Sequence, residues 1–86
     1  MKSVAVTVGT TPTLLVAADD KYRKVYVHVT GNTAVYLGNS SVTTSTGIET
    51  EKHTTPIEFE VPTKETIYAV CDTGTVDVRV MTPDVD

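Results

Sequence analysis

The chain has 86 residues, a formal net charge of -4 and a sequence pI near 4.9, and it contains no long run of Lys or Arg, so we do not expect nucleic acid as a partner. No apolar run approaches the ~20 residues of a membrane span, so we expect a soluble protein made in a cytoplasm, without a membrane partner. The length predicts one domain, residues 1–81, followed by an acidic tail at residues 82–86; a core this small gains from partner chains.

β-Branched residues dominate the composition. Val and Thr are the most frequent types, whereas Leu occurs at three positions only. These residues restrict χ1 and favour strands over helices. We therefore expect an all-β fold.

The first strand is predicted over residues 3–8, where Val4, Val6 and Val8 alternate with smaller residues. Pro12 cannot donate to a strand ladder, so pairing resumes only near Thr13, in a short apolar strand that ends near residue 17. A charged turn at residues 19–21 follows.

Residues 24–30 give the clearest strand, with valines on one face and Tyr26, His28 and Thr30 on the other. The valine face is expected in the core. Gly31-Asn32 tolerates positive φ, and a second apolar strand follows over residues 34–37. The spacing predicts that these two strands pair as an antiparallel hairpin.

Residues 34–50 are expected to form the central segment of the fold, with the other strands arranged around it. A strand stops at Gly38, a polar turn follows, and Val42 begins a Thr-rich loop that Gly47 bends again. Val42 looks like an exposed apolar residue in a polar loop, which is typical of a contact surface.

Three more strands complete the pattern. After an exposed loop over residues 50–55, residues 57–61 alternate apolar side chains with Glu58 and Glu60. Residues 66–71 are apolar on both faces, as in a strand between two neighbours or a strand covered by another subunit. A turn at residues 72–74 precedes the last strand, residues 76–80. About seven or eight short strands predict a compact antiparallel β-sandwich or small barrel.

Catalytic patterns are weak. Ser40 and Ser41 could act as nucleophiles and His28 or His53 as bases, but no nucleophile-elbow sequence surrounds the serines, which fit turn residues better. Glu58 and Glu60 lie on one strand face at a spacing compatible with paired carboxylates, yet charges that protect an edge strand explain them better. We expect no enzyme activity.

Metal and cofactor patterns are also weak. The two histidines and the single cysteine lack zinc-ligand spacing, and Asp19-Asp20 lacks the alternating ligands of a calcium loop. Cys71 excludes an internal disulfide and is expected to be a small buried hydrophobic residue. We expect no metal and no cofactor.

Four stretches, taken in chain order, give the sequence its likeness to a known group. They are residues 6–15 (VTVGTTPTLL), residues 35–38 (VYLG), Val42-Thr43-Thr44 with Gly47, and the closing residues 74–80 (GTVDVRV). Together they resemble small β-rich virion proteins of tailed bacteriophages, over nearly the whole span from Val4 to Val80.

The resemblance implies a structural protein on the phage head. The expected role is capsid decoration, in which many copies, as trimers, bind the major capsid protein and cement the lattice; the expected location is the virion, after synthesis in the host cytoplasm. The residues expected to contact a neighbouring chain are Tyr36, Leu37, Ser41, Val42, Thr43, Thr44 and Tyr68.

The alternative is an adhesion module of a head fibre or tail fibre. In that role Tyr22, Tyr26 or Tyr68 would bind host-surface glycans, because tyrosine contributes a large amphipathic contact area at low entropic cost. Binding to phage heads, compared with binding to the host envelope, separates the two roles.

Overall fold

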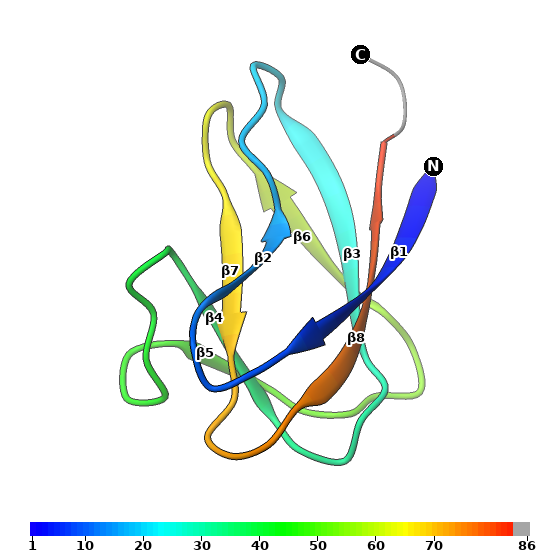
Figure 1. Ribbon diagram of the computed structural model, residues 1–86. Helices are drawn as coiled ribbons and strands as arrows, with labels where there is room; N and C mark the ends of the chain where they lie inside the picture. Colours follow the sequence, from blue (N-terminus) through cyan, green and yellow to red (C-terminus); the bar gives the residue numbers. More distant parts are fainter. Residues whose placement is uncertain (84–86) are drawn as a thin grey trace.

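The computed structural model describes residues 1–83 as an all-β sandwich without a helix (Figure 1). Eight strands make up the fold: β1 (Lys2–Val8), β2 (Thr13–Val16), β3 (Arg23–Val29), β4 (Val35–Gly38), β5 (Ile48–Thr50), β6 (Ile57–Val61), β7 (Ile67–Val70) and β8 (Val76–Thr82). The expected fold class and strand number are therefore confirmed.

Two four-stranded antiparallel sheets face each other. Sheet A has the order β1-β8-β3-β6, and sheet B has the order β2-β7-β4-β5. Only the connection from β4 to β5 joins two strands of one sheet. Every other connection crosses from one sheet to the other, so strands that are neighbours in the sequence mostly lie in different sheets.

The predicted hairpin between β3 and β4 is wrong. β3 pairs with β6 and β8 in sheet A, whereas β4 pairs with β5 and β7 in sheet B. Thr30 and Gly31 donate their amides to the carbonyl of Asp77, at 3.1 and 3.3 Å, which holds the end of β3 beside β8. β3 and β4 each bury one face that carries valines. The sequence shows the same alternation of valines whether two such strands pair in one sheet or lie in opposite sheets of a sandwich, so the alternation could not decide between the two arrangements.

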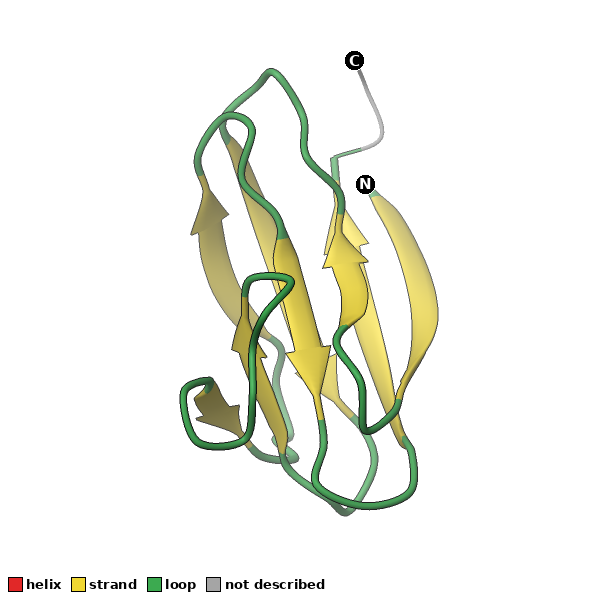
Figure 2. Ribbon diagram, turned by 60° about the vertical axis from the view of Figure 1, so that its left-hand side comes forward, coloured by secondary structure: helices red, strands yellow, loops and turns green. Residues whose placement is uncertain are grey.

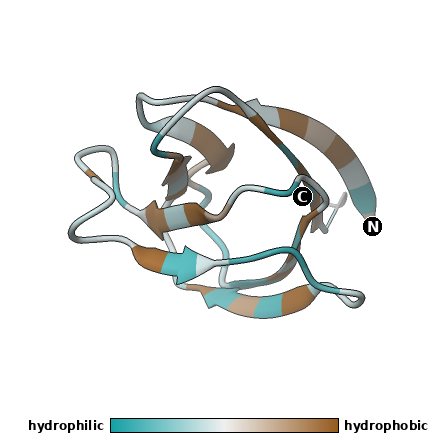
Figure 3. Ribbon diagram, turned by 90° about the horizontal axis from the view of Figure 1, so that it is seen from below, coloured by the Kyte–Doolittle hydropathy of each residue, from teal (hydrophilic) through white to brown (hydrophobic). Residues whose placement is uncertain are grey.

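The core consists mainly of valines on the inner faces of the two sheets. Hydrophobic and polar segments alternate along the strands (Figure 3), as expected for strands with one buried face. The fully buried residues include the predicted valine sets of β3 and β8: Val25, Val27, Val29, Val76, Val78 and Val80. In β1 the valine side chains are buried only toward the end of the strand: Val8 is buried, whereas Val4 is 42% exposed.

The ends of the chain differ slightly from the expected boundaries. β8 continues through Met81 to Thr82, which pairs with Lys2 of β1, so the strand extends into the predicted tail. Residues 84–86 of that tail lie outside the described residues.

Long loops at one end of the sandwich are tied together by the side chain of Arg23. Its guanidinium donates to the carbonyl oxygens of Ala17 at 2.7 Å, Lys21 at 3.2 Å and Glu65 at 3.2 Å. The amide of Lys64 donates to the carbonyl of Asp19 at 2.6 Å. These bonds fix the β2–β3 connection against the β6–β7 connection.

Candidate functional site

Val42 is buried between two glycines, contrary to the expectation that it is exposed. It is 5% exposed, and a Cβ built on Gly38 or Gly47 would lie 2.7 or 2.8 Å from its Cγ2 atom. A Cβ on Gly47 would also lie 2.7 Å from the Cβ of Tyr36. The loop of residues 39–47 therefore folds back onto β4, and the missing side chains of the two glycines make room for Val42.

The same loop is held by its own polar groups. The amide of Ser41 donates to Oδ1 of Asn39 at 2.9 Å, and the amide of Val42 donates to the Asn39 carbonyl at 3.0 Å. Thr43 and Thr46 bond each other through both side chains and backbone, and Gly47 donates its amide to the Thr43 carbonyl at 2.9 Å. The Thr-rich sequence thus forms a locally ordered loop, as expected of turn-forming hydroxyl side chains.

The loop covers the outer face of sheet B. In the β4–β7 pairing Gly38 lies opposite Tyr68 and Tyr36 opposite Val70, and residues opposite each other share a face. Val42 and Val70 are buried but lie outside the central core cluster. A second, smaller apolar layer therefore lies under the loop, on the side of sheet B away from the core.

The seven residues predicted to contact a neighbouring chain divide into two groups. Leu37 points to the core and is 6% exposed, and Val42 lies under the loop, so neither presents a contact surface. The other five lie on the outer side of sheet B or on the exposed loop, and we call them the loop face: Tyr36, Ser41, Thr43, Thr44 and Tyr68.

Tyr36 is the member of the loop face whose hydroxyl lies beside a carboxylate. Its hydroxyl donates to Oε2 of Glu49, its partner in the β4–β5 pairing, at 3.4 Å. The nearby Glu49 carboxylate disfavours a second negative charge and raises the pKa of Tyr36 above its usual value.

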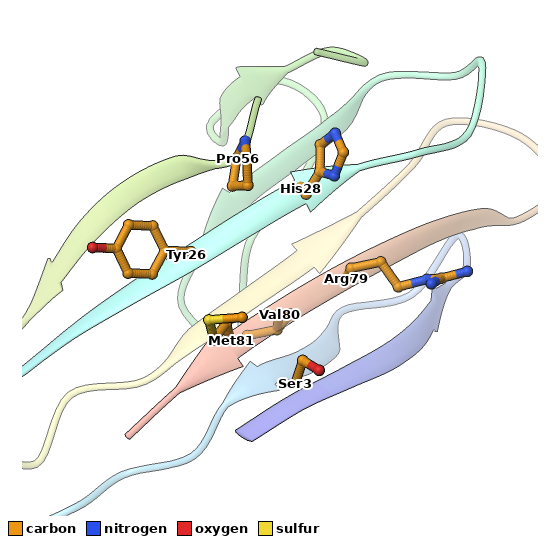
Figure 4. Close-up of a pocket in the computed structure, with 7 residues that line it drawn as sticks. All are labelled: Ser3, Tyr26, His28, Pro56, Arg79, Val80 and Met81. Atoms are coloured by element: carbon orange, nitrogen blue, oxygen red, sulfur yellow. The ribbon is translucent and has the colours of Figure 1, made fainter. Parts of the chain in front are cut away.

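A second candidate surface is a hollow on the outer face of sheet A (Figure 4). It has a volume of about 330 Å³ and is lined mostly by apolar atoms of Ser3, Tyr26, His28, Pro56, Arg79, Val80 and Met81. Register explains how they meet: Ser3 and Tyr26 both lie opposite Met81, and His28 lies opposite Arg79. Side chains from β1, β3 and β8 thus share one exposed face.

Three polar side chains around this hollow, Tyr26, His28 and Arg79, have partners within the chain. His28 Nε2 lies 2.7 Å from the His53 carbonyl, and the Tyr26 hydroxyl donates to Glu58 at 3.3 Å. Arg79 Nε donates to Asp77 Oδ2 at 2.9 Å. The hollow therefore offers an apolar floor, with a cationic guanidinium at its edge.

Asp77 is the anchor of this network. Thr30 Oγ1 donates to its Oδ2 at 2.7 Å, and this bond, followed by the bond from Arg79, lowers the pKa of the Asp77 carboxyl. The main-chain carbonyl of Asp77 also accepts hydrogen bonds from the backbone amides of Thr30 and Gly31, which follow the end of β3. The aspartate therefore links β3 to β8 through both its main chain and its side chain.

The residues considered for catalysis are not gathered into one site. Ser40 and Ser41 lie on the exposed loop of sheet B, whereas His28 belongs to the outer face of sheet A. Glu58 and Glu60 lie on β6, an edge strand as expected; Glu58 is 4.0 Å from the ammonium of Lys24, and Glu60 accepts from the Tyr22 hydroxyl. These contacts fit the expected structural role of the glutamates.

The possible metal ligands and the single cysteine were also located in the part of the chain that the structure describes. Residues 1–83 contain no group of three or more His, Cys, Asp or Glu side chains placed to hold a metal ion. Cys71 is buried, as expected, and its thiol lies 3.5 to 3.6 Å from the carbonyl oxygens of Val8, Thr73 and Gly74. Across the same residues, no helix is long and apolar enough to span a membrane.

Sequence reasoning missed the hollow and the burial of Val42. The hollow depends on the register that brings Met81 beside Tyr26, and residues 26 and 81 are too far apart in the sequence for a local pattern to join them. The two glycines flanking Val42 were a readable signal, since glycine within or next to a strand often marks a close approach. No protein family, curated protein or solved structure matches the chain.

Proposed function

We propose that this chain is a non-enzymatic structural protein of a bacteriophage particle, a decoration protein that binds the major capsid protein on the head in many copies. The proposal takes its functional class from the resemblance over Val4 to Val80. One structural observation supports it: the dispersed residues of the central motif form a single unit, in which Gly38 and Gly47 enclose Val42.

This unit presents exposed polar side chains to a partner. The buried Val42 and the hydrogen bonds of Asn39, Thr43 and Thr46 fix the loop, so little conformational entropy is lost when the exposed hydroxyls of Ser41 and Thr44 meet another chain. A weak contact of this kind is enough to stabilise a capsid when many copies bind the same lattice. A protein that binds only the assembled capsid shifts the equilibrium toward that assembled state by mass action.

The test uses purified chain and purified phage heads. We expect the chain to co-sediment with the heads, and we expect Ser41→Arg and Thr44→Arg each to weaken binding at least about tenfold, since bulky charges on a packed contact cost several kcal/mol. Thr75→Arg, at an exposed position of the β7–β8 connection, is the matched control. Absence of binding to heads, or equal binding by all three variants, would refute the proposal.

The second candidate, a glycan-binding adhesion module, is favoured by the hollow on sheet A. Tyr26 and Met81 form part of an apolar floor of the kind that stacks against a sugar ring. Of the other two candidate tyrosines, Tyr68 lies on sheet B, and Tyr22 does not line this hollow. Binding to host envelope that is lost in Tyr26→Ala and kept in Tyr68→Ala would support this role.

A further inference from the structure

The edge of sheet A formed by β1 is long and carries few of the features that protect sheet edges. β1 has seven residues with one charge, at Lys2, and no proline. It ends the strand order of its sheet, and β8 is its only strand partner within residues 1–83 (Figure 2). Every second residue of such a strand directs its amide and carbonyl to the open side, where another strand can pair.

The other three edges are protected. β6 carries Glu58 and Glu60 and is bounded by Pro56 and Pro62. β5 has three residues, and β2 has four residues with an irregular register between Leu14 and Val16. Short strands, charges, prolines and bulges are the usual means of preventing edge pairing. β1 is therefore the one edge on the described residues that is suited to adding a strand.

Apolar surface lies exposed beside this edge. A hollow of about 430 Å³ separates β1 from β2, and Val4, Val6, Leu14 and Val16 are among the residues that line it. Val4 points to the core side, because it lies opposite the buried Val80, yet it is 42% exposed. The apolar core is thus incompletely covered at the hollow between β1 and β2.

We propose that β1 pairs antiparallel with β1 of a second copy of this chain, forming a two-fold dimer with one continuous eight-stranded sheet. Residues opposite each other in an antiparallel pair share a face, so a self-pairing centred on Ala5 keeps every valine on the core side. In this register Ala5 lies opposite Ala5, Val4 opposite Val6, Ser3 opposite Thr7 and Lys2 opposite Val8.

This register suits a second copy better than an unrelated strand. It pairs all seven residues of β1, places no like charges opposite each other, and sets small side chains, Ala5 and Ser3, on the outer face at the contact. The partner's Val6 comes beside the exposed Val4 and extends the apolar layer over the hollow. The pairing is independent of the proposed function, and it is two-fold, whereas the resemblance implies a trimer.

Sedimentation velocity of the full chain over a range of concentrations tests the pairing. The expected mass rises from 9.2 kDa toward twice that value. Ala5→Glu and Ala5→Lys each place like charges opposite each other across the two-fold axis, so each alone weakens dimerisation about tenfold or more, and an equimolar mixture of the two restores it. Thr55→Glu, beside β6 at the far edge of sheet A, leaves dimerisation unchanged.

A covalent readout keeps the test independent of these charged variants. Facing residues of paired strands have Cα atoms 4.5 to 5.5 Å apart, within the range for a disulfide, so Ala5→Cys is expected to form a covalent dimer on oxidation and Thr55→Cys is not. A monomer at all concentrations, a trimer, an equal response of the two cysteine variants, or no effect of Ala5→Glu and Ala5→Lys would overturn the proposal. Neither readout involves phage heads, so failure here is separate from failure of head binding.

Discussion

A Cβ atom on Gly38 would lie 2.7 Å from Cγ2 of Val42, closer than nonbonded carbon atoms approach. The backbone of Gly38 does not have a positive φ, so space is what requires glycine at this position. The contact ties the end of β4 to the 39–47 loop and thereby shapes the loop face.

Gly38→Ala is expected to destabilise the fold by about 1–3 kcal/mol, the usual cost of overpacking. Urea unfolding measures this change. Gly9→Ala is the control, because a Cβ at Gly9 meets no atom within 4 Å, and it is expected to change stability by no more than about 0.5 kcal/mol.

Val42→Ala is expected to cost about 2 kcal/mol alone, since it removes buried apolar surface. Combined with Gly38→Ala it relieves the clash, so the double variant is expected to lose at least about 0.5 kcal/mol less than the sum of the two single losses. Strict additivity in urea unfolding would contradict the contact.

Lys64 and Gly74 both have left-handed backbones, with φ of 67° and 65°. A residue with a Cβ is strained there by about 1–2 kcal/mol, whereas glycine is not. Lys64→Gly is therefore expected to stabilise the fold by up to about 1 kcal/mol, because glycine also loses more chain entropy on folding. Gly74→Ala is expected to destabilise it by about 1–2 kcal/mol. Thermal unfolding measures both, and equal signs would count against this account.

Arg23 holds the carbonyl oxygens of Ala17, Lys21 and Glu65 through the fork of its guanidinium. A lysine ammonium is a compact donor and does not reproduce that geometry. Arg23→Lys is expected to cost about 1–2 kcal/mol and to speed amide hydrogen exchange in residues 63–66. Unchanged exchange there would show that the loops are fixed without the guanidinium.

Asp77 makes stability depend on pH. Because hydrogen bonds from Thr30 and Arg79 lower its pKa in the folded state, the ionised carboxylate stabilises the fold above the unfolded pKa, and this contribution is lost as pH falls through the folded pKa. Asp77→Asn is thus expected to be less stable than the natural chain at pH 7, with a difference that shrinks below about pH 4.

Thr30→Val tests the cause of that shift. It removes the hydroxyl that donates to Asp77 Oδ2, so the pKa of Asp77 is expected to rise toward its usual value in a carbon-detected NMR titration. An unmoved titration would mean that the Thr30 bond does not stabilise the carboxylate.

The valine alternation of β3 and β8 was enough to predict these strands and their buried faces, and the number of short strands along the chain was enough to predict a β-sandwich or small barrel. The alternation was not enough to predict which strands pair. Val29 and Val35 face the core from opposite sheets, and their sequence pattern would be the same in a hairpin. Pairing is decided by contacts between distant segments, such as the bonds from Thr30 and Gly31 to Asp77.

The candidate site shows the same division. Loop residues such as Ser41 and Thr44 are exposed, as their polar character predicts. The position of Val42 depends instead on three-dimensional fit against Gly38 and Gly47, and composition alone made it look exposed. The hollow at Tyr26 needs the register of three strands, which no single stretch of sequence contains.

The number of copies of this chain in each phage particle tests the proposed function most directly. Quantitative gel analysis of intact virions or image reconstruction gives that number. A decoration protein is expected in hundreds of copies on the head surface, because a lattice is cemented by summed contacts. A handful of copies confined to the tail, or absence from the particle, would contradict the account.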